Sequence, residues 1–232
     1  MTTMMISTNR TRQGTELPSA TRVALALNAL VALVGLAIKF GYAATERDPQ
    51  FPTRIGRLTN ELCYFTIQSN LIVVAVCALL AFGRGLRSNL LRTLRLVALV
   101  CIIVTGVVYR VLLAGDQSFT GWALVGDALV HSVSPILYVL TWLVLGPRGW
   151  VSGRAVQLVL VYPIAWVAFT LVRGRAIHFY PYGFIDVALH GYVKVFITVA
   201  VMMGLALLLA VLARAVDRRG SARSLGSSAL QA

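Results

Sequence analysis

The chain has 232 residues, of which 58% are hydrophobic and only 12% charged, and its mean hydropathy is +0.80. Soluble domains carry about twice that share of charged residues, so this composition excludes a soluble protein and predicts an all-α membrane bundle. The net charge of +13 does not indicate nucleic-acid binding, because the basic residues fall in short loops between apolar runs.

Six apolar runs are long enough to cross a bilayer as helices. In chain order they are residues 20–44, 60–82, 91–114, 122–145, 155–172 and 188–213. We therefore expect one transmembrane domain over 20–214. It follows a polar N-tail over 1–19, which lacks the apolar core of a cleavable signal peptide. A Ser-, Gly- and Arg-rich C-tail over 215–232 is predicted to be disordered.

The loop charges predict the orientation of the bundle. The two tails and the second and fourth loops together hold 13 basic residues and two acids, whereas the rest of the chain holds eight basic residues and six acids. Basic loops stay in the cytoplasm, so we expect both termini there. The expected location is the cell (inner) membrane, with membrane lipids as partners.

The second predicted span opens with an unusually polar stretch, residues 61–70, in which seven of ten side chains carry a polar atom or a thiol. Such groups are costly in hydrocarbon unless they face protein or water. Thr66 lies at the centre of this stretch and shares a helical face with Asn70. The commonest use of an intramembrane threonine is a hydrogen bond to its own i−4 carbonyl, and that alternative stays open for Thr66.

The fourth predicted span carries a polar stripe on one helical face. Its members are Asp127, His131, Ser134, Tyr138 and Thr141. Asp127 lies one turn before His131 and can orient its imidazole, and Pro135 predicts a kink beside it. Counted from the outer ends of their spans, Thr66 lies about 9 Å deep and His131 about 13 Å deep. The simpler alternative is a buried histidine that Asp127 satisfies without any chemistry.

Further polar residues are predicted near the same outer level. Tyr109 and Arg110 end the third span, and Asp186, His190 and Lys194 follow one another at i+4 into the sixth. We expect Lys194 to pair with Asp186 or Asp127. Lys39 closes the first span, where snorkelling to the interface explains it.

The chain contains no recognisable metal or cofactor motif. It has no G-x-S-x-G elbow, no H-E-x-x-H pair and no glycine-rich phosphate loop. Its three cysteines, Cys63, Cys77 and Cys101, match no metal or disulfide spacing, so we expect them to be small apolar fillers. We expect no cofactor.

Three short motifs resemble a known family. They are Tyr64-Phe65-Thr66, His131-Ser-Val-Ser-Pro135, and Tyr180-Pro181 followed by Gly191 and Lys194. In this order, over residues 60–198, they resemble the bacterial six-pass branch of the androgen-induced-gene and androgen-dependent TFPI-regulating membrane proteins. Where the family tends to carry Asn before its histidine, this chain has Asp127, and the match at Lys194 is loose.

The resemblance implies an activity. Eukaryotic members are multi-pass lipid hydrolases that cleave fatty acid esters of hydroxy fatty acids with a threonine nucleophile and a histidine. The matching positions are Thr66 and His131. On this hypothesis Asp127 orients His131, and Asn70 or Arg110 stabilises the oxyanion. Residues Tyr180, Asp186 and Lys194 are predicted to support the site.

Two other functions fit the same residues. In a transporter or proton relay, Asp127, His131 and Lys194 pass a proton. A through-path needs polar residues at both depths, however, and the half of the membrane nearer the termini looks almost purely apolar apart from Asn28. In a structural subunit the same groups make interhelical hydrogen bonds only.

Overall fold

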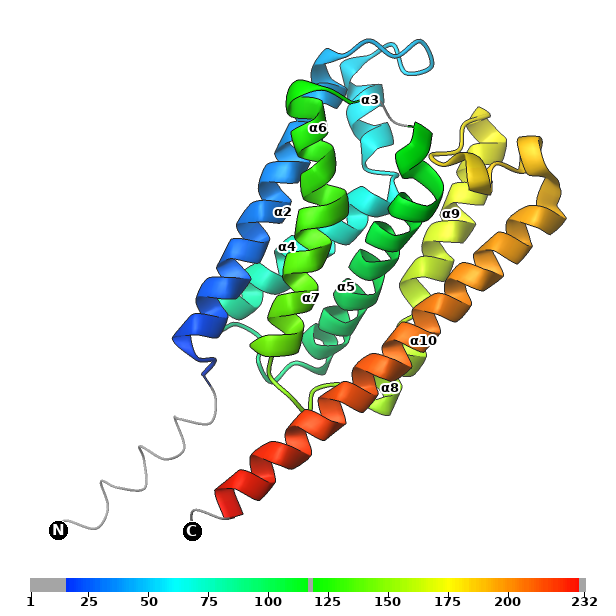
Figure 1. Cartoon of the computed structure of the whole chain (residues 1–232). Helices are drawn as coiled ribbons and strands as arrows, with labels where there is room; N and C mark the ends of the chain where they lie inside the picture. The colour runs from blue at the N-terminus through cyan, green and yellow to red at the C-terminus, as the bar shows by residue number, and fades with distance from the viewer. Residues whose placement is uncertain (1–15, 117–118, 230–232) are drawn as a thin grey trace.

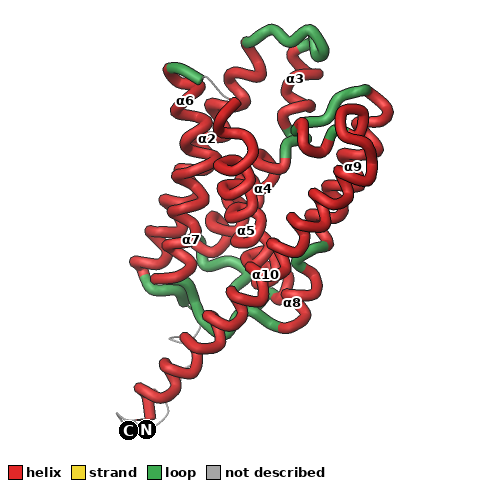
Figure 2. The backbone as a smooth tube through the Cα atoms, turned by 45° about the vertical axis from the view of Figure 1, so that its right-hand side comes forward, coloured by secondary structure: helices red, strands yellow, loops and turns green. Residues whose placement is uncertain are grey.

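The computed structural model describes residues 16–116 and 119–229, and this part of the chain contains helices and no strand. Figures 1 and 2 show the helices running alongside one another, with the connections at the two ends of the bundle. Five helices are long and apolar enough to cross a membrane, and a bent pair would make a sixth. The prediction of an all-helical protein with several membrane-length apolar helices is confirmed.

The elements follow one another along the chain with few long connections. The first half comprises α2 (Ser19–Thr45), α3 (Arg54–Glu61), α4 (Phe65–Ala81), α5 (Asn89–Val108), the π-helical turn η1 (Tyr109–Leu113) and the 3-10 turn η2 (Ala114–Asp116). The second half comprises α6 (Gly121–Ala128), the π-helical turn η3 (Leu129–Val133), α7 (Ser134–Val144), α8 (Gly153–Leu158), α9 (Val161–Ile177), the 3-10 turn η4 (Gly183–Ile185) and α10 (Val187–Ala229).

The second predicted span is not one continuous helix. It is the bent pair α3 and α4, which meet at 71°. The break leaves backbone carbonyls without their helical donors, so these carbonyls need other partners in the interior. Gln68 donates to the carbonyl of Leu62 at 2.9 Å, and the indole of Trp166 donates to that of Cys63 at 2.9 Å. Gln68, one of the polar residues after Glu61, therefore helps to stabilise this break.

Small residues allow α2 to approach the rod formed by α6, η3 and α7. A Cβ on Gly126 would lie 2.6 Å from Ile38, and one on Gly35 would lie 2.8 Å from Val130. Behind this contact, buried apolar residues of α4, α5 and α7 form the main core. All three cysteines are unpaired and buried, as predicted.

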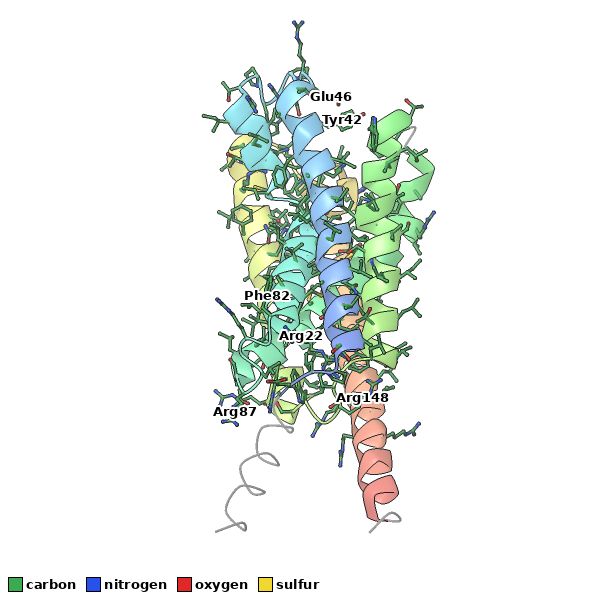
Figure 3. The ribbon with its side chains drawn as sticks, turned by 90° about the vertical axis from the view of Figure 1, so that its left-hand side faces the viewer. Arg22, Tyr42, Glu46, Phe82, Arg87 and Arg148 are labelled. Atoms are coloured by element: carbon green, nitrogen blue, oxygen red, sulfur yellow. The ribbon has the colours of Figure 1, made fainter. Side chains whose placement is uncertain are left out.

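Charge is distributed unevenly between the two ends of the bundle. In Figure 3, Arg22, Arg87 and Arg148 lie toward the end where α2 begins, whereas Tyr42 and Glu46 lie at the opposite end. Figure 1 shows that α10 also finishes at the arginine-rich end.

The last helix extends into the predicted C-tail. A disordered C-tail was expected from residue 215, whereas α10 continues to Ala229. Asp217 explains part of this, since its buried carboxylate accepts a hydrogen bond of 2.8 Å from the backbone N–H of Val151 and ties α10 to the α7–α8 connection. Residues 1–15 of the predicted N-tail and residues 230–232 of the C-tail lie outside the described residues.

Candidate functional site

Thr66 and His131, predicted from separate spans, are in contact. Thr66 lies in the first turn of α4, and its Oγ1 is 3.2 Å from Nε2 of His131 in η3. Both residues are buried, with 7% and 8% of their surface exposed. The depth count along an unbroken second span was wrong in its geometry, because the span bends just before Thr66. The bend places the hydroxyl at the start of a helix.

The second ring nitrogen of His131, Nδ1, contacts a carboxylate that orients the imidazole. Nδ1 lies 2.9 Å from Oδ1 of Asp127, one turn earlier, and the hydroxyl of Tyr109 donates to Oδ2 of the same carboxylate. The Tyr109 ring also stacks on the imidazole, with 3.9 Å between ring centroids. An Nδ1–H that donates to Asp127 leaves Nε2 bare, so Nε2 can accept the proton of Thr66.

Two π-helical turns help to build this arrangement. Tyr109 begins η1 and His131 lies in η3, and each turn widens the helix locally. Pro135 cannot donate a backbone N–H to the carbonyl of His131, and the irregularity predicted beside it takes the form of η3. The five-residue polar stripe is confirmed, since all its members are buried.

Tyr182, in the connection between α9 and α10, completes the surroundings of Thr66, and the sequence analysis missed it. The Thr66 N–H donates to the Tyr182 hydroxyl at 3.2 Å, and the two hydroxyl oxygens lie 3.3 Å apart. Removal from water raises the pKa of Tyr182 to about 12, so its hydroxyl keeps its proton at neutral pH. The only sequence signal was its place one residue after the Tyr180-Pro181 motif.

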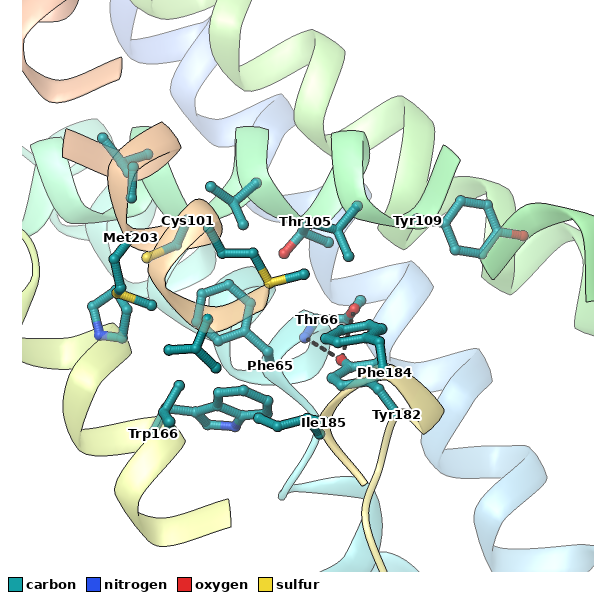
Figure 4. Close-up of a pocket in the computed structure, with 18 of the residues that line it drawn as sticks. Phe65, Thr66, Cys101, Thr105, Tyr109, Trp166, Tyr182, Phe184, Ile185 and Met203 are labelled. Carbon is teal, nitrogen blue, oxygen red and sulfur yellow. Dashed lines mark hydrogen bonds between the residues drawn. The ribbon is translucent and has the colours of Figure 1, made fainter. Parts of the chain in front are cut away.

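Two cavities meet at Thr66. The polar cavity has a volume of about 360 Å³ and is lined by Lys39, Glu61, Thr66, Asp127, His131 and Tyr182. Lys39 therefore faces this cavity, whereas snorkelling alone was expected for it. The second cavity, which we call the apolar slot, includes Phe65, Cys101, Val104, Trp166, Met203 and Ala206 in its wall (Figure 4). Thr66, Tyr109 and Tyr182 belong to both walls.

The two predicted oxyanion donors are engaged with other partners. Asn70 is fully buried, but its amide donates to the carbonyls of Thr66 at 2.9 Å and Val130 at 3.1 Å. Its donors are thus engaged in joining α4 to η3. Arg110 is exposed and donates to the hydroxyl of Ser132 at 2.8 Å, and it lines neither cavity. This geometry therefore does not support either residue as the oxyanion donor.

Three further predicted supporting residues lie outside the site. Lys194 is exposed on α10 and forms no ion pair with Asp186 or Asp127, contrary to expectation. Asp186 instead accepts hydrogen bonds from the N–H groups of Ala188 and Leu189 and caps the start of α10. Tyr180 packs its ring against Gly174. Local spacing misled here, because Gly191 has a φ of 71° and interrupts the helical register between Asp186 and Lys194.

The half of the bundle nearer the arginine-rich end is more polar than the sequence indicated. Arg95 is only 4% exposed and donates to the carbonyl of Pro147 at 3.2 Å. The Tyr138 hydroxyl donates to the carbonyl of Arg95, and Asn28 donates to Thr141 at 2.8 Å. These groups bond to partners within that half.

Comparison of the chain with protein-family models, curated proteins and solved structures finds no match. The geometry therefore carries the functional inference. A hydroxyl, an imidazole and a carboxylate are linked in series beside a cavity, and a tyrosine hydroxyl lies on the other side of the hydroxyl. This is the arrangement in which a weak nucleophile can be activated by a general base.

Proposed function

We propose that this protein is an intramembrane threonine hydrolase that cleaves fatty acyl esters of lipids. One observation carries the proposal: Oγ1 of Thr66 lies 3.2 Å from His131, which is itself 2.9 Å from Asp127. A threonine hydroxyl needs a base to react as a nucleophile, and a free imidazole nitrogen within hydrogen-bond reach supplies one. The resemblance to a family of threonine-dependent lipid hydrolases points to the same pair.

The reaction proceeds in two halves. His131 takes the proton of Thr66 as Oγ1 attacks the ester carbonyl carbon, and Asp127 stabilises the imidazolium that forms. His131 then gives this proton to the departing alcohol oxygen as the carbon–oxygen bond of the ester breaks. Water replaces the alcohol, His131 takes its proton, and the hydroxyl attacks the acyl carbon. The bond to Oγ1 breaks, Thr66 recovers its proton, and the fatty acid leaves.

Tyr182 is the best-placed donor for the oxyanion that forms in each half. Its hydroxyl accepts from the Thr66 N–H, so its own proton is available for an oxygen bound beside Oγ1. The position at the start of α4 favours negative charge as well, because the first N–H groups of a helix lack intrahelical acceptors. These donors take the role that was assigned to Asn70 and Arg110.

The membrane arrangement is part of the proposal. In the proposed arrangement the bent pair α3–α4 is one of six spans. Both termini lie in the cytoplasm, beside the arginine-rich loops. The polar cavity then faces the outer side of the cell (inner) membrane. Water reaches His131 from that side, while a lipid ester approaches from the surrounding bilayer.

Active-site labelling tests the proposal. A fluorophosphonate reacts with activated hydroxyl nucleophiles, so we expect it to label the purified protein. Labelling should be lost in Thr66→Ala and reduced at least ~100-fold in rate in His131→Ala. Thr198→Ala is the matched control, since that hydroxyl bonds to the carbonyl of Lys194 and lines neither cavity.

The same preparations should hydrolyse a fatty acid ester of a hydroxy fatty acid, with released fatty acid as the readout. Labelling that persists in Thr66→Ala would overturn the assignment of the nucleophile. A correctly folded wild-type protein that neither reacts with the probe nor releases fatty acid from any lipid ester would overturn the proposed activity.

A further inference from the structure

The polar cavity and the apolar slot divide the space around Thr66 by chemistry. The polar cavity contains Lys39, Glu61 and His131 in its wall. The slot is lined almost entirely by carbon and sulfur, with Cys101, Trp166 and Met203 among its residues (Figure 4). A molecule whose reacting atom lies at Thr66 can therefore extend one polar part and one apolar part in different directions.

The position of His131 decides which part of an ester goes where. His131 must protonate the departing alcohol and later activate the water that replaces it, so both have to lie beside its Nε2. Of the two cavities, His131 lines only the polar one. The alcohol therefore lies in the polar cavity, and the acyl chain must leave the carbonyl carbon on the opposite side of Thr66.

From this geometry we infer that the apolar slot binds the acyl chain of the substrate and that the residues at its far end from Thr66 select chain length. The inference rests on the proposed function and adds the orientation of the substrate. From Tyr109 at the start of η1 to Cys101 in α5 the wall extends about 12 Å, at 1.5 Å per residue. Ala206 and Met203 of α10 lie at the same end as Cys101, since α10 runs antiparallel to α5 (Figure 1).

The slot is narrow and must widen to admit a chain. Its volume is about 50 Å³, so a linear chain fits only if α10 moves away from its neighbours. α10 is the wall best placed to move, because it supplies Met203 and Ala206 to the slot while its opposite face is exposed. A narrow slot that opens along its length accepts an unbranched chain and rejects a bulky group.

Binding can be tested without hydrolysis in the Thr66→Ala protein. Trp166 lines the slot and is only 8% exposed, so a fatty acid brominated along its chain should quench its fluorescence only by entering the slot. The additional substitution Trp166→Phe isolates this signal from that of the other tryptophans. Ala206→Leu should abolish the Trp166 quenching by a long chain, whereas Ala200→Leu, on the exposed face of α10, should not.

Opposite shifts in chain-length preference provide a second readout with Thr66 intact. Ala206→Leu shortens the slot and should lower kcat/KM for a palmitoyl ester relative to an octanoyl ester by about 10-fold or more. Met203→Ala lengthens it and should shift the ratio toward the longer chain. A folding defect cannot produce both shifts.

Equal Trp166 quenching in Ala206→Leu and Ala200→Leu, or quenching of full size after Trp166→Phe, would overturn the slot as the acyl site. The expected quenching pattern, combined with a wild-type protein that the fluorophosphonate does not label, would instead keep the slot as an acyl-chain site and overturn the hydrolysis at Thr66.

Discussion

Thr66 differs from three other helical threonines in what its hydroxyl contacts. Thr45, Thr93 and Thr198 each donate to the carbonyl four residues earlier, which is the usual bond of a helical threonine. Thr66 makes no such bond. Its Oγ1 lies between His131 and Tyr182, because the break before α4 removes the helical carbonyl it would have used.

Substitution of Tyr182 tests the role of its hydroxyl beside Thr66. Tyr182→Phe removes a donor from beside Oγ1 and leaves the ring in place. We expect kcat to fall by about 10²–10³-fold with little change in KM, the pattern for a lost oxyanion donor. Tyr180→Phe is the control, because that residue lines neither cavity. Steady-state kinetics that give the two variants equal activity would remove Tyr182 from the mechanism.

At the scale of the elements, close packing between α2 and the α6–η3–α7 rod sets the position of His131. Gly126 and Gly35 lie where the helices nearly touch, and Gly35 faces Val130, the neighbour of His131. A side chain at either glycine pushes the rod outward. Since interiors are close-packed, the displacement cannot be absorbed locally and should reach the imidazole.

Substitution of Gly126 tests whether the packing of α2 against α6 positions His131. Gly126→Val should destabilise the protein by about 1–3 kcal/mol through overpacking and should slow fluorophosphonate labelling by moving His131 away from Thr66. Gly41→Val, on α2 like Gly35 but with no atom within 4 Å of an added Cβ, should leave both unchanged. Thermal unfolding and labelling rates measure the two effects. Normal labelling in a stable Gly126→Val protein would show that this contact does not position His131.

At the scale of the whole molecule, the uneven charge distribution predicts how the bundle lies in the membrane. Glu46 and Arg87 are exposed at opposite ends (Figure 3). With both termini in the cytoplasm, an impermeant maleimide added to intact cells should label Glu46→Cys and not Arg87→Cys. The three native cysteines are buried and give little background. Labelling of Arg87→Cys alone would reverse the orientation, and labelling of both would contradict a single orientation.

Helices, their apolar character and the polar stripe of the fourth span could be predicted because they depend on residues near one another in the chain. Hydrophobic length and a 3.6-residue period are local properties, and they correctly placed Asp127 and His131 on one buried face. Loop charge can likewise be counted directly along the sequence. The pairing of Thr66 with His131 needed the family resemblance as well, because periodicity did not separate Thr66 from its polar neighbours.

Only the tertiary structure decided what surrounds that pair. The break before α4 is stabilised by Gln68 from its own helix and by Trp166 from α9, so the polar stretch alone could not reveal it. Tyr182 reaches Thr66 from a connection 116 residues later in the chain, and the two π-helical turns bring Tyr109 against His131. These contacts join residues far apart in sequence, and their energy depends on distances that no local pattern encodes. For the same reason Asn70, Arg110 and Lys194, which share the predicted depth, have other partners or lie on other faces.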